Sequence, residues 1–172
     1  VIAQFSEGDW ILLQNEIANV DCAIEYAHAR KLRVALNPSP FDDVISRCNL
    51  NYVDMLLINE VEGAELTGAA EPEQILSILR TQYMNLSVLL TLGEHGAIFV
   101  DSQGIRYHVP SVPCVVKDTT AAGDTFTGYF LTSYFKDYDV SRALAIAATA
   151  SSIAVSREGA ASSIPYRCEV LT

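Results

Sequence analysis

Short apolar runs alternate with helix-like segments in the first sixty residues of the chain. The runs Trp10–Leu13, Arg33–Leu36 and Met55–Ile58 are typical of buried strands, and the segments between them, Val20–Leu32 and Phe41–Cys48, are helix-like. Strands that alternate with helices form mainly parallel sheets, because each helix returns the chain to the end of the sheet where the next strand begins. The chain therefore predicts an α/β fold, a mainly parallel sheet with helices on both faces.

Residue types that cap or break helices mark further element boundaries. Asn19 is expected to cap the first helix, Gly68 to close a short helix at residues 64–67, and Pro72 to begin the next one. Strands are expected at Ser87–Leu92, Ala97–Val100 and Arg106–Val109, and a buried helix at Arg142–Val155 that begins at Asp139 or Ser141.

Composition limits the classes of partner. The 172 residues suffice for a single domain, residues 1–172, that buries roughly 70% of its unfolded surface. The formal charge of −10 and the lack of a basic cluster argue against nucleic acid as a partner. No apolar run is long enough to span a membrane, so no membrane partner is expected. Scattered cysteines are interpreted as reduced thiols of a cytoplasmic protein: Cys22, Cys48, Cys114 and Cys168.

The segment from Asp118 to Gly128 reads Asp-Thr-Thr-Ala-Ala-Gly-Asp-Thr-Phe-Thr-Gly and leads into an apolar helix-like run. The first amides of a helix lack intrahelical partners and lie at the positive end of its dipole, so Ala121, Ala122 and Gly123 can form an anion hole for a phosphate. Asp124 in the first turn can then accept a proton from a hydroxyl beside it. The alternative is an ordinary loop and helix start.

This segment resembles the second signature of the PfkB carbohydrate kinase family, most closely that of its ribokinase branch, and the similarity extends from Trp10 to Val170. The resemblance implies a ribokinase-like three-layer α/β/α sandwich that uses ATP and Mg²⁺. It implies that Asp124 is the catalytic base, which also contacts the substrate, and that Ala121 to Asp124 hold the transferred phosphate.

Asn59 and Glu62 follow the apolar run Met55–Ile58 at the spacing of a helix capping box. The same pair resembles the Asn-x-x-Glu motif of the PfkB family. That resemblance implies that Asn59 contacts ATP phosphates and that Glu62 holds Mg²⁺ through water.

Two loops add further candidates for ligand binding. Thr91 to Gly96 reads as a hairpin turn, but it resembles the ribokinase loop that contacts ATP through Thr91 and the loop backbone. This resemblance adds the turn residues Gly93, Glu94, His95 and Gly96 to Gly123 as ATP-binding candidates, without a chemical role for His95. By the same resemblance, Glu16 corresponds to a ribokinase glutamate in the sugar pocket; the alternative is a solvated loop residue.

Small residues follow the last long helix, from Ser156 to Ser163. They form either a helix end with a glycine C-cap or a loop whose carbonyls bind a monovalent cation. In ribokinases K⁺ lies beside the anion hole, and the resemblance implies a largely carbonyl site made by Asp118, Thr120, Ala154, Arg157, Gly159 and Ser163. Ala148 replaces a polar residue that ribokinases often place near the nucleotide, which leaves the adenine contacts open.

The sequence thus predicts a carbohydrate kinase that transfers the γ-phosphoryl group of ATP to a sugar hydroxyl, with D-ribose as the first candidate. A related kinase for another sugar or a nucleoside, and a non-catalytic nucleotide-binding module, stay open. The chain begins at Val1 and matches the C-terminal portion of the family. We therefore expect the N-terminal part with its lid to be missing, the chain alone to be inactive, and homodimers to form through an exposed edge.

Overall fold

A computed structural model describes residues 2–137 and 139–171. Six strands form one sheet in the order β1-β2-β3-β4-β5-β6. The strands are β1 (Trp10–Gln14), β2 (Arg33–Asn37), β3 (Met55–Asn59), β4 (Ser87–Thr91), β5 (Ala97–Val100) and β6 (Arg106–Val109). The helices are α1 (Val20–Ala29), α2 (Asp43–Arg47), α3 (Glu60–Thr67), α4 (Pro72–Gln82), α5 (Ala122–Asp137), α6 (Val140–Val155) and α7 (Arg167–Val170). The predicted α/β fold with a mainly parallel sheet is confirmed.

Three short 3₁₀ helices complete the described elements, at Ile2–Gln4, Leu50–Tyr52 and Gly93–His95. Within the part of the chain that the structure describes, no helix is both long and apolar enough to cross a membrane.

The chain divides into two compact units. The first unit extends to Leu90 and includes Val100–Arg106, and the second contains Thr91–Phe99 and the residues from Tyr107 onward. The interpretation of the chain as a single domain stays a prediction.

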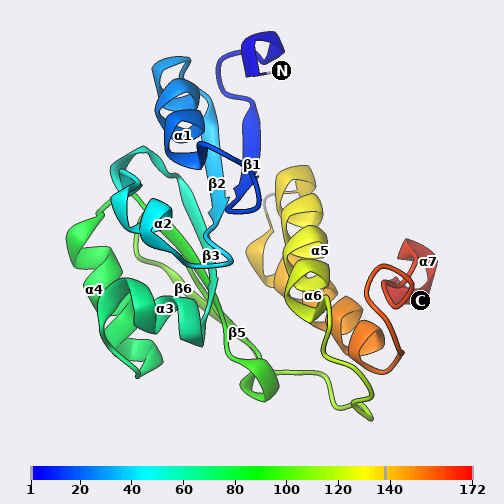
Figure 1. Cartoon of the computed structure of the whole chain (residues 1–172). Helices are drawn as coiled ribbons and strands as arrows, with labels where there is room; N and C mark the ends of the chain where they lie inside the picture. The colour runs from blue at the N-terminus through cyan, green and yellow to red at the C-terminus, as the bar shows by residue number, and fades with distance from the viewer. Residues whose placement is uncertain (1, 138, 172) are drawn as a thin grey trace. The chain divides into compact units, whose positions relative to one another are not determined.

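Parallel pairing organises the first unit. β1 pairs with β2 from Trp10 opposite Arg33 to Gln14 opposite Asn37, and β2 pairs with β3 through Leu36 opposite Leu56. Strands β2 and β3 are apolar and buried from Val34 to Leu36 and from Met55 to Ile58, as expected for a sheet covered by helices. α1 packs on β1 and β2, and α3 packs on β3 and α4 (Figure 1).

Helices α5 and α6 pair closely in the second unit. Phe99 on β5 packs against Phe130 and Tyr134 of α5, with ring centroids 5.2 and 5.9 Å apart. Aromatic pairs at such separations stabilise a core beyond the area that they bury. This cluster fixes one face of α5.

Most helix boundaries follow the predicted capping chemistry. The Asp139 side chain accepts a hydrogen bond from the Arg142 amide at the start of α6, and Gly68 ends α3 in the left-handed conformation. Asn19 is a correction: it precedes α1 with φ 61°, and its side chain makes no capping hydrogen bond. Because its backbone is left-handed, the side chain does not reach the first helical amides.

Candidate active site

The start of α5 carries the predicted anion hole and base. Asp124 is exposed in the first turn, and Ala121, immediately before the helix, has φ 62°. The Ala122 amide donates to the Thr119 carbonyl at 3.1 Å, so it must share or release this bond to reach a phosphate. Gly123 is exposed, and no atom lies within 4 Å of the position that a Cβ would take there. Gly123 therefore offers the most open approach to the backbone.

A cavity of about 520 Å³ opens beside this helix start. Residues of four segments of the second unit line it: Thr91, Gly93, Glu94 and Gly96; Ser111, Val112, Pro113, Cys114 and Val116; Thr119, Ala122, Gly123 and Phe126; Ala148, Ser151, Ser152 and Val155. The Ser151 hydroxyl donates to the Ala122 carbonyl at 3.2 Å, which ties α6 to the start of α5. The volume lies in the range of small-molecule sites.

The turn at residues 93–96 is built around Gly96. Its φ is 90°, and a Cβ there would lie 2.0 Å from the Val109 carbonyl oxygen. The Ser111 hydroxyl donates to the Glu94 carbonyl at 2.5 Å, which joins the turn to the segment after β6. The His95 side chain is exposed, and His95 is not among the residues that line the cavity.

Asp118 is the centre of the proposed cation loop. One carboxylate oxygen accepts the Thr120 amide at 2.8 Å, and the other accepts the Gly159 amide at 3.0 Å. Hydrogen bonds from the Thr120 hydroxyl and from these two amides lower the pKa of Asp118. The amides of Lys117 and Asp118 both donate to the Val155 carbonyl. The structure thus brings the Asp118 segment against the loop after α6.

The other predicted cation ligands lie in or next to this loop. Ala154 and Ser163 are buried, and the Ser163 hydroxyl donates to the Ala160 carbonyl at 2.7 Å. The Arg157 guanidinium is paired with Glu169 and has no acceptor atom, so Arg157 could bind a cation only through its backbone carbonyl. α6 ends at Val155 and its C-cap is Ser156, whereas Gly159 lies three residues beyond Ser156 with φ 95°, so Gly159 is not the helix C-cap. A carboxylate and loop carbonyls fit the oxygen ligands that a weakly hydrated cation prefers.

Asp124 lines a second cavity, of about 380 Å³, which extends along α5 toward α7. Thr125 lines it too, and its buried hydroxyl has no hydrogen-bond partner. Gly123 and Asp124 are neighbours in the chain, yet they line different cavities. Asp124 is therefore not among the residues that line the cavity beside Gly123.

Asn59 and Glu62 form the predicted capping box in the first unit. The Glu62 amide donates to the Asn59 side chain at 2.9 Å, and the Asn59 amide donates to the Glu62 carboxylate at 3.0 Å. The Asn59 amide binds one carboxylate oxygen of Glu62, a residue that is only 8% exposed. No group of three His, Cys, Asp or Glu side chains that could hold a metal ion occurs among residues 2–137 and 139–171.

Glu16 is exposed in the turn after β1. Its neighbour Asn15 donates through its side chain to the Pro40 carbonyl at 2.7 Å. This bond joins the loops at the carboxyl ends of β1 and β2, the end at which open α/β sheets bind ligands.

The model of the pfkB family carbohydrate kinases matches residues 4–167. The chain belongs to this family. Ribokinase of Haemophilus influenzae is 32% identical over 175 residues, which cover 98% of this chain and 56% of the relative. Ribokinase of Schizosaccharomyces pombe is 35% identical over 176 residues, which cover 97% of this chain and 55% of the relative.

A solved structure of Arabidopsis thaliana ribokinase complexed with ribose and ATP superimposes on this pfkB chain with a TM-score of 0.80. The two are 29% identical, and the match covers 94% of this chain and 54% of the other. The chain thus spans little more than half the length of the relatives that it matches.

Sequence reasoning missed several residues that line the larger cavity of this pfkB chain: Ser111, Val112, Pro113, Cys114, Val116, Phe126, Ser151, Ser152 and Val155. Some carried a signal. Val116 is a large apolar residue that is 60% exposed, and Ser151 and Ser152 interrupt an alanine-rich helix. An exposed apolar side chain, or polar residues in an otherwise apolar helix, can indicate a ligand-binding site.

Proposed function

We propose that the protein is an ATP-dependent sugar kinase that transfers the γ-phosphoryl group to a hydroxyl of D-ribose. The observation that carries the proposal is the cavity of about 520 Å³ whose lining includes Gly123, one residue before the carboxylate of Asp124. Membership of the pfkB family and two ribokinase relatives that match nearly all of this chain support it.

The adenine would lie between Ala148 and Ser152 of α6 and the apolar segment that contains Val112 and Val116. Small side chains on α6 leave room for a flat ring, so a polar residue at position 148 is not needed for shape. Thr91 and the turn residues Gly93 to Gly96 would contact the nucleotide from the other wall, largely through the backbone. The triphosphate would then extend toward the start of α5, where the helix dipole favours negative charge.

In the chemical step, the oxygen of the sugar hydroxyl bonds to the γ-phosphorus while Asp124 takes the proton of that hydroxyl. The bond from that phosphorus to the β,γ-bridging oxygen breaks, and ADP leaves. The transition state of phosphoryl transfer is loose, so the protein mainly aligns the groups and neutralises charge. The Gly123 amide, with Ala121 and Ala122, would hold the transferred phosphoryl oxygens.

Two ions belong to the proposal. Mg²⁺, when bound, neutralises charge on the β- and γ-phosphates. Glu62 would hold it through water, and Asn59 would contact a phosphate. Asp118, Thr120 and the carbonyls of Ala154, Arg157, Gly159 and Ser163 would surround K⁺, which fits the oxygen-rich loop at Asp118.

The deciding experiment is ribose-dependent ADP release by the longest product that the gene encodes, with Asp124→Asn as the test variant. A general base contributes about 10²–10⁴ in rate, so we expect a loss of at least about a hundredfold in kcat. Asn keeps the shape of the side chain but does not take the proton. Turnover within about tenfold of the parent, or about 1.4 kcal/mol, would show that Asp124 is not the base.

The choice of sugar needs its own assay, in which ribose, fructose and a nucleoside are compared by kcat/KM. We expect ribose to give the highest value. Glu16→Gln should raise the KM for the preferred sugar more than that for ATP, because Glu16 is proposed to contact the sugar alone. A preference for fructose or the nucleoside would leave the kinase class standing and remove ribose from the proposal.

A further inference from the structure

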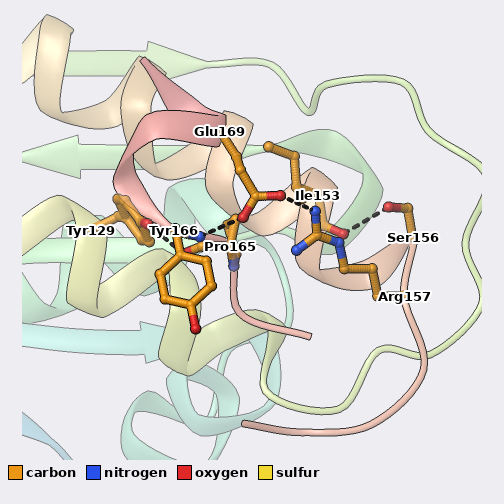
Figure 2. Close-up of polar contacts among 7 residues, drawn as sticks. All are labelled: Tyr129, Ile153, Ser156, Arg157, Pro165, Tyr166 and Glu169. Carbon is orange, nitrogen blue, oxygen red and sulfur yellow. Dashed lines mark hydrogen bonds and ion pairs between the residues drawn. The ribbon is translucent and has the colours of Figure 1, made fainter. Parts of the chain in front are cut away.

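Glu169 on α7 makes two hydrogen bonds that fix its carboxylate. One oxygen accepts from the Arg157 guanidinium at 2.5 Å, and the other accepts from the Tyr166 amide at 2.7 Å (Figure 2). Both side chains of the ion pair are little more than one-third exposed. Because the Tyr166 bond orients the carboxylate, the Arg157 side chain meets a fixed partner rather than a mobile one.

Arg157 lies at the start of the loop that reaches Asp118. Its amide donates to the Ala154 carbonyl at 3.0 Å, at the end of α6. Two residues later, the Gly159 amide donates to Asp118, whose other oxygen holds the Thr120 amide. The guanidinium is thus anchored two residues from the Gly159 amide, and Thr120 immediately precedes the proposed anion hole.

A second anchor holds the far end of the same segment. The Tyr129 hydroxyl on α5 donates to the Pro165 carbonyl at 2.6 Å, immediately before Tyr166 (Figure 2). Ser163, between the two anchors, is completely buried. The loop from Ser156 to Pro165 is therefore fastened to α7 near its beginning and to α5 at its end, and its conformation depends on both fastenings.

We propose that Glu169, acting through Arg157, is a positioning residue that holds the Gly159 amide on Asp118 and so sets the geometry at the entrance to the proposed phosphate site. The kinetic part of this inference rests on the proposed function. A surface ion pair contributes little to global stability, so its effect is local, on the loop that it fastens.

The first test is amide hydrogen exchange, measured by NMR on the 172-residue chain. Glu169→Gln keeps an acceptor for the Tyr166 amide and removes the charge that binds Arg157. We expect the Gly159 and Thr120 amides to exchange about fivefold faster, while the core amides of β5 and α5 keep their rates. Glu158→Gln is the matched control, because Glu158 is exposed in the same loop. Arg157→Lys, which keeps the positive charge, should restore most of the protection lost in Arg157→Gln.

Unchanged Gly159 and Thr120 exchange in Glu169→Gln would overturn the inference, whatever the protein catalyses. The second test compares the same variants in the kinase assay described above, with the longest product that the gene encodes. We expect Glu169→Gln to lower kcat about fivefold and to raise the K⁺ concentration for half-maximal activity, with the KM for sugar unchanged. Faster exchange with unchanged kinetics, in an enzyme that Asp124→Asn inactivates, would overturn the link to the phosphate site and leave the proposed function standing. Kinase activity that survives Asp124→Asn would instead count against the proposed base, and the exchange data would still decide the positioning role.

Discussion

Gly96 is a position where only glycine fits. Its φ of 90° lies in the region that L side chains rarely adopt, and a Cβ would lie 2.0 Å from the Val109 carbonyl oxygen. We expect Gly96→Ala to destabilise the protein by about 2–4 kcal/mol, because backbone atoms rather than a flexible side chain must move. Chemical denaturation measures the loss.

Gly93→Ala is the control for that substitution. Gly93 also has a positive φ, of 52°, but nothing lies within 4 Å of its Cβ position. Gly93→Ala should lower the free energy of unfolding by only about 1 kcal/mol, the cost of the left-handed backbone alone. Equal losses at the two glycines would show that the turn relaxes around the new methyl group.

Cys114 reports on the larger cavity, because it is an exposed thiol in the cavity wall. We expect MgATP to slow its alkylation by iodoacetamide at least about tenfold, since bound nucleotide would cover the wall. Peptide mass spectrometry resolves the four cysteines. Cys168 is exposed and lines neither cavity, so it should react at the same rate with and without nucleotide.

Cys48 provides an internal reference in the same experiment. Burial raises the pKa of its thiol to about 11, so little thiolate forms near neutral pH and alkylation should be slow in every sample. Protection of Cys114 that is matched at Cys168 would indicate general stabilisation instead of a covered cavity.

Substitutions of Asn59, in the capping box at the start of α3, can distinguish a structural role of this residue from a role in nucleotide binding. Asn59→Asp keeps the oxygen that accepts the Glu62 amide and adds a negative charge at a helix N-terminus. The melting temperature should therefore be unchanged or slightly higher. MgATP affinity should fall about tenfold if the Asn59 amide donates to a phosphate, because the carboxylate would repel it.

Asn59→Ala is the complementary variant. It removes the cap and should cost about 1 kcal/mol in the free energy of unfolding. Thermal unfolding and isothermal titration on the same samples distinguish the two roles. Unaltered MgATP binding by Asn59→Asp would show that Asn59 caps the helix and does not contact a phosphate.

Local chemistry made many elements predictable. The Asn59–Glu62 box, Pro72 at the start of α4 and Gly68 after α3 each act within one helical turn, so sequence spacing was sufficient. Asn19 has the right residue type for a cap, but a left-handed backbone set by its surroundings prevents the bond. Backbone conformations of this kind depend on tertiary packing, which spacing does not encode.

The candidate site was predictable only in part for the same reason. The Asp118 segment carries its signal in eleven consecutive residues, whereas the cavity wall combines segments near Thr91, Ser111 and Ser151. Those segments are joined by contacts between residues far apart in the sequence, such as the hydrogen bonds from Ser111 to Glu94 and from Ser151 to Ala122, so no local pattern identified Ser111 or Ser152. The bond between Arg157 and Glu169, twelve residues apart, was hidden likewise.

For the molecule as a whole, acid should be destabilising although the formal charge is −10. Four carboxylates have lowered pKa values because donors bind them: Glu73 at Arg106, Glu169 at Arg157, Asp118 at Thr120, and Asp42 at the Ile45 amide. A lowered folded pKa means that the unfolded chain binds more protons. The four carboxylates therefore contribute their full stabilisation of the folded state above the unfolded pKa values of 3.8 for Asp and 4.5 for Glu. This stabilisation is lost as pH falls through the lowered pKa values of the folded state.

Relief of charge repulsion on acidification acts in the opposite direction, but salt near 0.15 M screens exposed charges beyond about 8 Å. We therefore expect a level melting temperature from about pH 7 to pH 5 and a fall below about pH 4.5. Calorimetry across this range measures it. Glu73→Gln, which breaks the ion pair with Arg106, should melt lower than the parent near pH 7, and the difference should shrink as pH falls through the lowered pKa of Glu73, because protonated Glu73 no longer carries the charge of that pair. A melting temperature that rises on acidification would mean that repulsion among the excess acidic groups outweighs the four bound carboxylates.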